Sequence, residues 1–215
     1  MTTPDSRVAF VSGDRLTGWV SRFAASHGEL TWEEVDGGLQ LRAVDGATAL
    51  LQPPWPADGR PGRGEDAVSR LASLAAQSRV LGLVLVRRGG YSVAVVSGGA
   101  VLASKTGSRH VQSRTAAGGW SQQRFARRRA NQADALVEAV AGHAERIFAA
   151  HRVEYLAPGG DRALAEQVLA EPGLKRYAGL TRLPFLDVPD PRASVLKQAA
   201  ADLCAVKILV TDPRE

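Results

Sequence analysis

The residues best suited to chemistry lie in one basic segment, residues 105–129, which reads KTGSRHVQSRTAAGGWSQQRFARRR. This segment contains seven Lys and Arg side chains and no Asp or Glu. Its adjacent glycines, Gly118 and Gly119, allow the backbone to approach a ligand closely. Ser121 is a suitable N-cap for a following helix, whose first N–H groups attract anions. The segment therefore predicts a solvated loop that enters a narrow, anionic site.

Other side chains of the segment also suit contact with nucleic acid. We favour phosphate contact over acid–base catalysis for His110, because it lies among cations. Trp120 either stacks on a nucleobase or anchors the loop on its own domain, and the sequence leaves both open. Basic side chains at the start of a helix oppose its dipole, so a bound anion would compensate for them. Three arginines are expected there: Arg124, Arg127 and Arg128.

Charge is distributed unevenly along the chain. Residues 67–133 contain eleven Lys and Arg and no acidic residue, so the rest of the chain carries a net charge of −6 and the whole chain +5. The asymmetry favours a directed phosphate-binding surface over a general effect on solubility. The alternative is a solvated charged face on an Arg-rich protein.

Composition excludes several classes of protein. The single cysteine, Cys204, rules out an internal disulfide and is expected to pack in the core, and four scattered histidines show no zinc spacing. We find neither a signal peptide nor an apolar stretch of membrane-spanning length. We therefore expect a cytoplasmic, monomeric protein with no metal, no cofactor and no membrane contact.

Apolar periodicity predicts the elements that precede the segment. A helix is expected over residues 14–26, followed by strands over 30–35, 38–44 and 47–52 with Asp-Gly turns between them. A Pro- and Gly-rich loop then continues to residue 64. Residues 1–64 are therefore predicted to form a small α+β segment ahead of the main domain.

Residues 65–215 are predicted to form an α/β domain, with a mixed β-sheet and helices on its faces. The basic loop is placed at 105–120 and a long helix at 121–150. An apolar stripe predicts that this helix docks on the sheet: Ala126, Ala130, Ala133, Val137, Val140, Ala144 and Ile147. The other expected elements are strands over 79–88, 91–96, 100–104, 152–157, 183–188 and 205–210, and helices over 65–77, 161–170 and 191–203.

The common catalytic signatures are missing, since there is no phosphate-binding GxxxxGK[ST], no GxSxG and no GxGxxG after a strand. Gly159 and Gly160 follow a predicted strand, and a simple turn is favoured over a phosphate cradle. Asp187 and Asp190 resemble paired nuclease carboxylates, but the neighbouring prolines favour a loop.

The run from Gly118 to Arg129 resembles the catalytic segment of the central domain of eukaryotic and archaeal class-1 translation release factors. In those proteins a GGQ tripeptide precedes a Ser-x-x-Arg-Phe-Ala-Arg run that opens a helix. The chain is more similar still to the VLRF (Vms-like release factor) family, whose members free nascent peptides from tRNA on stalled ribosomes and carry a displaced glutamine. Here Trp120 occupies the third position, and glutamines follow only at Gln122 and Gln123.

The resemblance implies a peptidyl-tRNA hydrolase that acts on stalled large-subunit complexes. Gln122, or failing that Gln123, would position water for ester hydrolysis, with Gly118 and Gly119 offering backbone N–H groups. The cations that would neutralise ribosomal or tRNA phosphates are Lys105, Arg109, Arg114, Arg124, Arg127 and Arg128. The alternatives are a non-catalytic module that binds ribosomes or tRNA, and an RNA nuclease that uses His110 or the aspartates.

Overall fold

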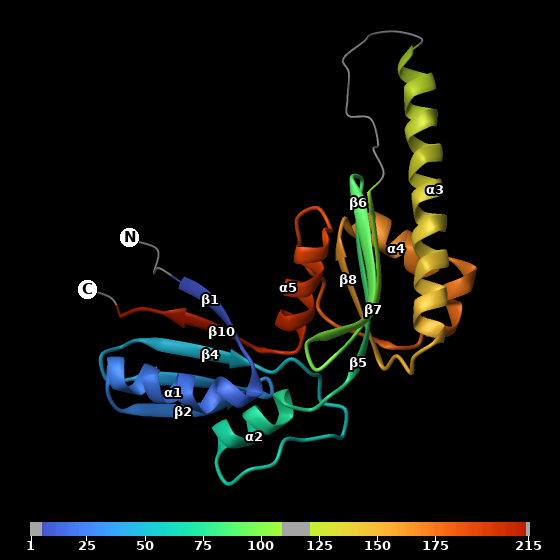
Figure 1. Ribbon diagram of the computed structural model, residues 1–215. Helices are drawn as coiled ribbons and strands as arrows, with labels where there is room; N and C mark the ends of the chain where they lie inside the picture. Colours follow the sequence, from blue (N-terminus) through green and yellow to red (C-terminus); the bar gives the residue numbers. More distant parts are fainter. Residues whose placement is uncertain (1–5, 109–120, 214–215) are drawn as a thin grey trace. The chain divides into compact units, whose positions relative to one another are not determined.

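The computed structural model describes residues 6–108 and 121–213, with the backbone but not the side chains of 121–130. The chain divides into two compact units, one of residues 1–78 with 201–215 and one of residues 79–200 (Figure 1). This division differs from the predicted boundary after residue 64. The helix over residues 67–75 and the last strand of the chain both pack in the first unit. Neither placement can be predicted from the local sequence.

The first unit has a five-stranded antiparallel sheet in the order β1-β10-β4-β3-β2. Asp36 and Gly37 both have positive φ, as the predicted Asp-Gly hairpin turn between β2 and β3 requires. β1 was not predicted, and the last strand, which was expected in the mixed sheet, belongs to this one. The strands are β1 (Ser6–Val11), β2 (Leu30–Val35), β3 (Gly38–Ala43), β4 (Thr48–Gln52) and β10 (Val206–Thr211).

Two helices, α1 (Gly13–His27) and α2 (Ala67–Ala75), cover one face of this sheet. Asp66 caps α2, because its carboxylate accepts a hydrogen bond of 2.8 Å from the backbone N–H of Ser69. The core between helices and sheet is apolar and closed to solvent, and it includes Leu16, Phe23, Leu41, Leu51, Leu71 and Ile208.

The second unit has a mixed five-stranded sheet in the order β7-β6-β5-β8-β9, which confirms the predicted mixed sheet with helices on its faces. β5 pairs antiparallel with β6 and parallel with β8. Up to Val86 its sequence, VLGLVLVR, is apolar because both faces of this central strand are buried, and Arg87 ends it. The strands are β5 (Val80–Arg87), β6 (Gly90–Ser97), β7 (Ala100–Ser108), β8 (Tyr155–Gly160) and β9 (Thr181–Arg182).

Helices lie on both sides of this sheet (Figure 1). α3 (Ser121–Ala149) and α4 (Arg162–Ala170) lie on one side, and α5 (Ala193–Leu203) begins on the other, where the Ser92 hydroxyl donates to the Pro191 carbonyl over 3.1 Å. The predicted stripe of α3 is confirmed at Val137, Val140 and Ala144, which are buried against the sheet. The burial continues through Leu136, Ala141 and Phe148, which the predicted stripe omitted.

Two predicted boundaries in this unit are wrong. β8 starts three residues later than expected and includes Pro158-Gly159-Gly160, because parallel pairing with β5 continues to Val86↔Gly160. The expected strand over 183–188 is reduced to a single bridge between Gly159 and Leu186, while the short strand β9 precedes it. The segment that follows α4 forms a 3₁₀ helix, η1 (Pro172–Tyr177).

None of the helices in the described part of the chain has the length and apolar character that a membrane crossing needs.

Candidate functional site

The basic segment begins in one element of the second unit and ends in another. The loop was predicted from residue 105, but β7 continues to Ser108, where it pairs with Gly90. α3 begins at Ser121, as predicted. Lys105 lies in β7 with its side chain exposed. Six of the predicted site residues lie outside the described residues: Arg109, His110, Arg114, Gly118, Gly119 and Trp120.

The two candidate glutamines lie on the helix rather than in a loop. The backbone of Gln122 and Gln123 forms the first turn of α3. Arg124, Arg127 and Arg128 follow on the same helix, and the side chains of all five lie outside the described residues. The structure thus places these residues on one element, at the end of α3 next to the predicted glycine loop.

α3 supports this end of the site as a long, firmly anchored rod. Its 29 residues correspond to a length of about 43 Å at roughly 1.5 Å per residue. From Leu136 to Phe148 the helix is docked on the sheet, whereas Asn131 and Ala135 are exposed. Figure 1 shows the first turns of α3 extending past the end of the sheet. The geometry therefore carries the N-terminal end of α3 away from the body of its unit.

A basic and aromatic cluster lies beside Lys105, and sequence reasoning missed it. The rings of Tyr91 on β6 and His143 on α3 are stacked with centroids 5.5 Å apart. His143 Nδ1 lies 2.5 Å from a guanidinium nitrogen of Arg146. Together with Lys105 on β7, the cluster joins residues from three elements, so no local sequence motif predicts it.

The ring of His143 is held in its neutral form at pH 7. Burial lowers the pKa of His143 from its ordinary value of 6.5, and the charges of Arg146 and Lys105 lower it further. Lys105 and Arg146 remain available to attract an anion, because neither shares an ion pair with an acid in the described part of the chain. The cluster extends the positive charge of the basic segment along the side of α3.

Gly159 and Gly160 do not form a phosphate cradle. The N–H of Gly160 donates to the Leu186 carbonyl over 2.9 Å, and that of Asp161 donates to the Val86 carbonyl over 2.7 Å. A Cβ on Gly160 would lie 2.3 Å from the Val86 carbonyl oxygen. These N–H groups are therefore used to join β8, β5 and the following chain. The Asp161 carboxylate caps α4, because it accepts a hydrogen bond from the N–H of Leu164.

The two aspartates considered for nuclease chemistry, Asp187 and Asp190, lie in a loop and contact neighbouring parts of the chain. Asp187 accepts a hydrogen bond of 2.9 Å from Arg87, whose Nε donates to the Val188 carbonyl. Asp190 lies beside Gly89. Within residues 6–108 and 121–213 no group of three or more His, Cys, Asp or Glu is placed to hold a metal ion. Cys204 is buried, as predicted.

The part of the chain that is similar to a known protein family begins where the second unit begins. No curated protein matches the chain. The family model described as Actinobacteria/chloroflexi VLRF1 release factor matches residues 79–209, which starts at the first residue of the second unit and ends inside β10. The match covers well over half of the chain and confirms the resemblance drawn from the basic segment. The protein belongs to the Actinobacteria/chloroflexi VLRF1 release factor family.

Proposed function

We propose that this protein is a peptidyl-tRNA hydrolase that frees nascent peptides from tRNA on stalled large-subunit complexes. The observation that carries the proposal is the sequence of residues 118–129, which includes the first residues of α3 and lies inside the part matched by the release factor family. The run contains both the glycine pair and the candidate amides. The docked half of α3 supplies a rigid support for them.

The chemistry requires little from the protein itself. Peptidyl-tRNA is an ester, so hydrolysis needs a water molecule held in line with the carbonyl carbon and donors for the developing oxyanion. The amide of Gln122, or failing that Gln123, accepts from and donates to that water without ionising. Backbone N–H groups of Gly118 and Gly119 are suited to the oxyanion or the leaving oxygen. The ribosome and the tRNA supply the rest of the site.

Charge supports docking on ribosomal RNA. Residues 79–200 contain 18 Lys and Arg against 9 Asp and Glu, a net charge of +9 for the second unit. Such a surface adds affinity and salt dependence through phosphates rather than sequence choice. The proposed RNA contacts are Lys105, Arg109, His110, Arg114, Trp120, Arg124, Arg127 and Arg128.

Peptide release from purified ribosome–peptidyl-tRNA complexes tests the proposal. Gln122→Ala or Gln123→Ala is expected to slow release by about 100-fold or more, because removal of one positioned donor costs roughly two to three orders of magnitude. Gln132→Ala is the matched control: the same substitution ten positions after Gln122 in α3, and it is expected to leave release unchanged. Co-sedimentation with ribosomes should be the same for all three variants.

The other outcomes separate the alternatives. Release that survives both single substitutions would disprove the glutamine mechanism. Wild-type protein that binds ribosomes without releasing peptide would indicate a binding module. Loss of catalysis would then agree with Trp120 standing where the GGQ motif has its glutamine. Cleaved RNA on a denaturing gel would indicate a nuclease.

A further inference from the structure

The first unit contains a pocket that the family match does not cover. The pocket has a volume of about 610 Å³, within the range of roughly 300–1,000 Å³ that is usual for ligand sites. It lies between α2 and the connection from β4 to α2, residues 53–66. All of its lining residues fall between Glu34 and Leu74, whereas the family match begins at residue 79.

The wall formed by residues 53–66 has no helix or strand of its own but is fixed at several points. The side-chain amide of Gln77 donates to the carbonyls of Arg60 and Pro61 over 3.2 and 3.1 Å. The N–H of Arg63 donates to the Ser73 hydroxyl over 3.1 Å. Gly62 lies so close to α2 that a Cβ there would be 1.8 Å from the Arg70 carbonyl oxygen. Long irregular connections that are held in place in this way are commonly functional, and a fixed wall reduces the entropy lost on binding.

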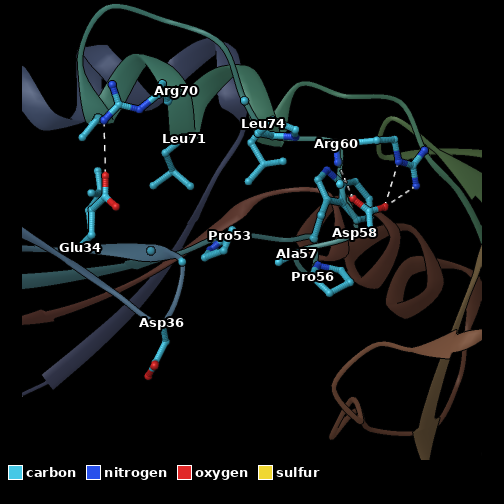
Figure 2. Close-up of a pocket in the computed structure, with 18 residues that line it drawn as sticks. Glu34, Asp36, Pro53, Pro56, Ala57, Asp58, Arg60, Arg70, Leu71 and Leu74 are labelled. Atoms are coloured by element: carbon cyan, nitrogen blue, oxygen red, sulfur yellow. Dashed lines mark hydrogen bonds and ion pairs between the residues drawn. The ribbon is translucent and has the colours of Figure 1, made fainter.

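The inside of the pocket is apolar and its ends are charged. Figure 2 shows Leu71 and Leu74 extending from α2 towards Pro53 and Pro56. Trp55, only 2% exposed, also lines the pocket. An ion pair lies at each end, with Glu34 3.4 Å from Arg70 and Asp58 2.7 Å from Arg60. Asp36 adds a third carboxylate, so the lining has three acids and two arginines.

The net charge of the first unit indicates which kind of ligand the pocket would bind. Residues 1–78 and 201–215 contain 13 Asp and Glu against 9 Lys and Arg, a net charge of −4. This sign repels nucleic acid phosphates and attracts a cationic partner. Beside the pocket, hydrogen bonds from the Ser69 side chain and N–H hold the pKa of Asp66 below its ordinary value, which keeps that carboxylate ionised. The pocket therefore suits an apolar group that is carried on a positively charged chain.

We propose that this pocket binds a basic peptide segment of a protein partner and that one large apolar side chain of the segment inserts between α2 and residues 53–62. The inserted side chain would contact Leu71, Leu74 and Pro56. The basic residues on either side of it would meet Glu34 and Asp58 at the two ends. Binding of this kind concentrates affinity in one desolvated anchor, with the rim charges guiding orientation.

Fluorescence anisotropy with defined probes tests the proposal on the full-length protein. The probes are labelled peptides of the form Gly-Arg-Lys-X-Arg-Lys-Gly, in which X is Trp, Leu or Ser. The Trp and Leu peptides are expected to bind at least about tenfold more tightly than the Ser peptide, because a buried anchor typically contributes more than 1.4 kcal/mol. Ala57→Trp places a bulky ring at an exposed lining position and is expected to abolish that preference.

Two neighbouring carboxylates of β2 give a matched pair of charge variants. Glu34 lines the pocket and pairs with Arg70, whereas Glu33 lies on the other face of the sheet and pairs with Arg42 at 3.0 Å. Glu34→Gln is expected to lower the affinity for the Trp peptide by about two- to fivefold, as for the loss of an exposed charge contact. Glu33→Gln, which removes the same charge from the same strand, is expected to leave its affinity unchanged.

Three results would overturn the proposal. The first is that the Trp, Leu and Ser peptides bind with equal affinity, or that none of them binds, since the apolar anchor would then contribute nothing. The second is a short labelled poly-uridine RNA that binds the wild type and is lost with Ala57→Trp, which would assign the pocket to nucleic acid. The third is a dimer in size-exclusion chromatography that Ala57→Trp dissociates, which would assign it to a second copy of the chain. Circular dichroism of each variant checks that the fold is retained.

Discussion

His143 lies where the long helix of the second unit meets the sheet, stacked on Tyr91 and close to Lys105 and Arg146. Partial burial and two neighbouring cations all disfavour its charged form, so its pKa is lowered from 6.5. In the window just below pH 6.5 the unfolded chain therefore binds more protons than the folded protein. Stability must fall as the pH falls through that window.

The pH dependence of stability tests this assignment. From about pH 7.5 to about pH 5.5 the free energy of unfolding should fall more for the wild type than for His143→Gln, which removes the titrating group. Asp45 and Asp66 do not confuse the comparison, because their pKa values are lowered from 3.8 and their effects arise at lower pH. Urea unfolding at the two pH values gives the difference. A His143 ring that titrates at or above 6.5 by NMR would contradict the prediction.

Individual residues were predictable where their role is local. α3 begins at Ser121 as expected, and Asp161 caps α4, because the start of a helix depends mainly on the residue type and the next few positions. Gly160 was predicted to lie in a turn, yet it pairs within β8. Its tight contact with the Val86 carbonyl comes from a strand far away in the sequence. The roles of Gln122 and Gln123 remain predictions, which the release measurements address.

At the scale of elements, α3 and its sheet form the support for the proposed catalytic end. Phe148 is fully buried at the base of this support. A Cβ on Gly82 would lie 2.8 Å from the Phe148 ring, and Tyr177 contacts that ring edge-on with centroids 5.4 Å apart. The absence of a side chain at Gly82 therefore makes room for an aromatic ring that locks the helix to β5.

Phe148→Ala should destabilise the second unit by about 3–5 kcal/mol, because it removes a buried ring and leaves a cavity. Ile147→Ala, at a partly buried neighbour, should cost less. Native-state hydrogen exchange of the β5 and β6 amides reports on this unit directly. Equal exchange rates in both variants would show that Phe148 does not anchor the helix.

Elements with a strong period were predicted well, and elements defined by their partners were not. The spacing of apolar residues three and four positions apart in α3 predicted its buried face over Val137, Val140 and Ala144. β1 was missed, since its Val8 and Phe10 are exposed and the strand exists by pairing with β10. The run over 183–188 looked extended, but it is not a continuous strand: Leu186 forms a single bridge with Gly159, and Leu183 donates one backbone hydrogen bond to Leu156.

At the scale of the whole molecule, the last strand completes the first unit rather than the second. β10 lies between β1 and β4 and pairs with both, so it is a central strand of that sheet. Ile208 points into the core and is 0% exposed, whereas the neighbouring Lys207 is exposed. The first unit therefore depends on the end of the chain for its fold.

Ile208→Asp should destabilise the first unit by about 4 kcal/mol or more, because it buries an unpaired charge. Lys207→Glu, one position away on the solvent face, should change stability by less than about 1 kcal/mol. Tryptophan fluorescence during urea unfolding reports mainly on this unit, which contains three of the four tryptophans of the chain: Trp19, Trp32 and Trp55. If Ile208→Asp unfolds no earlier than Lys207→Glu, β10 is not needed for the sheet.

The sequence by itself determined the family, the long docked helix and the basic segment that leads into it, because these depend on adjacent residues and on a regular period. Only the tertiary structure decided the division into two units, the central place of β10 and the pocket between α2 and residues 53–66. Each of these joins residues that are distant in the chain, and such pairings are fixed by packing and backbone hydrogen bonds that no single stretch of sequence contains.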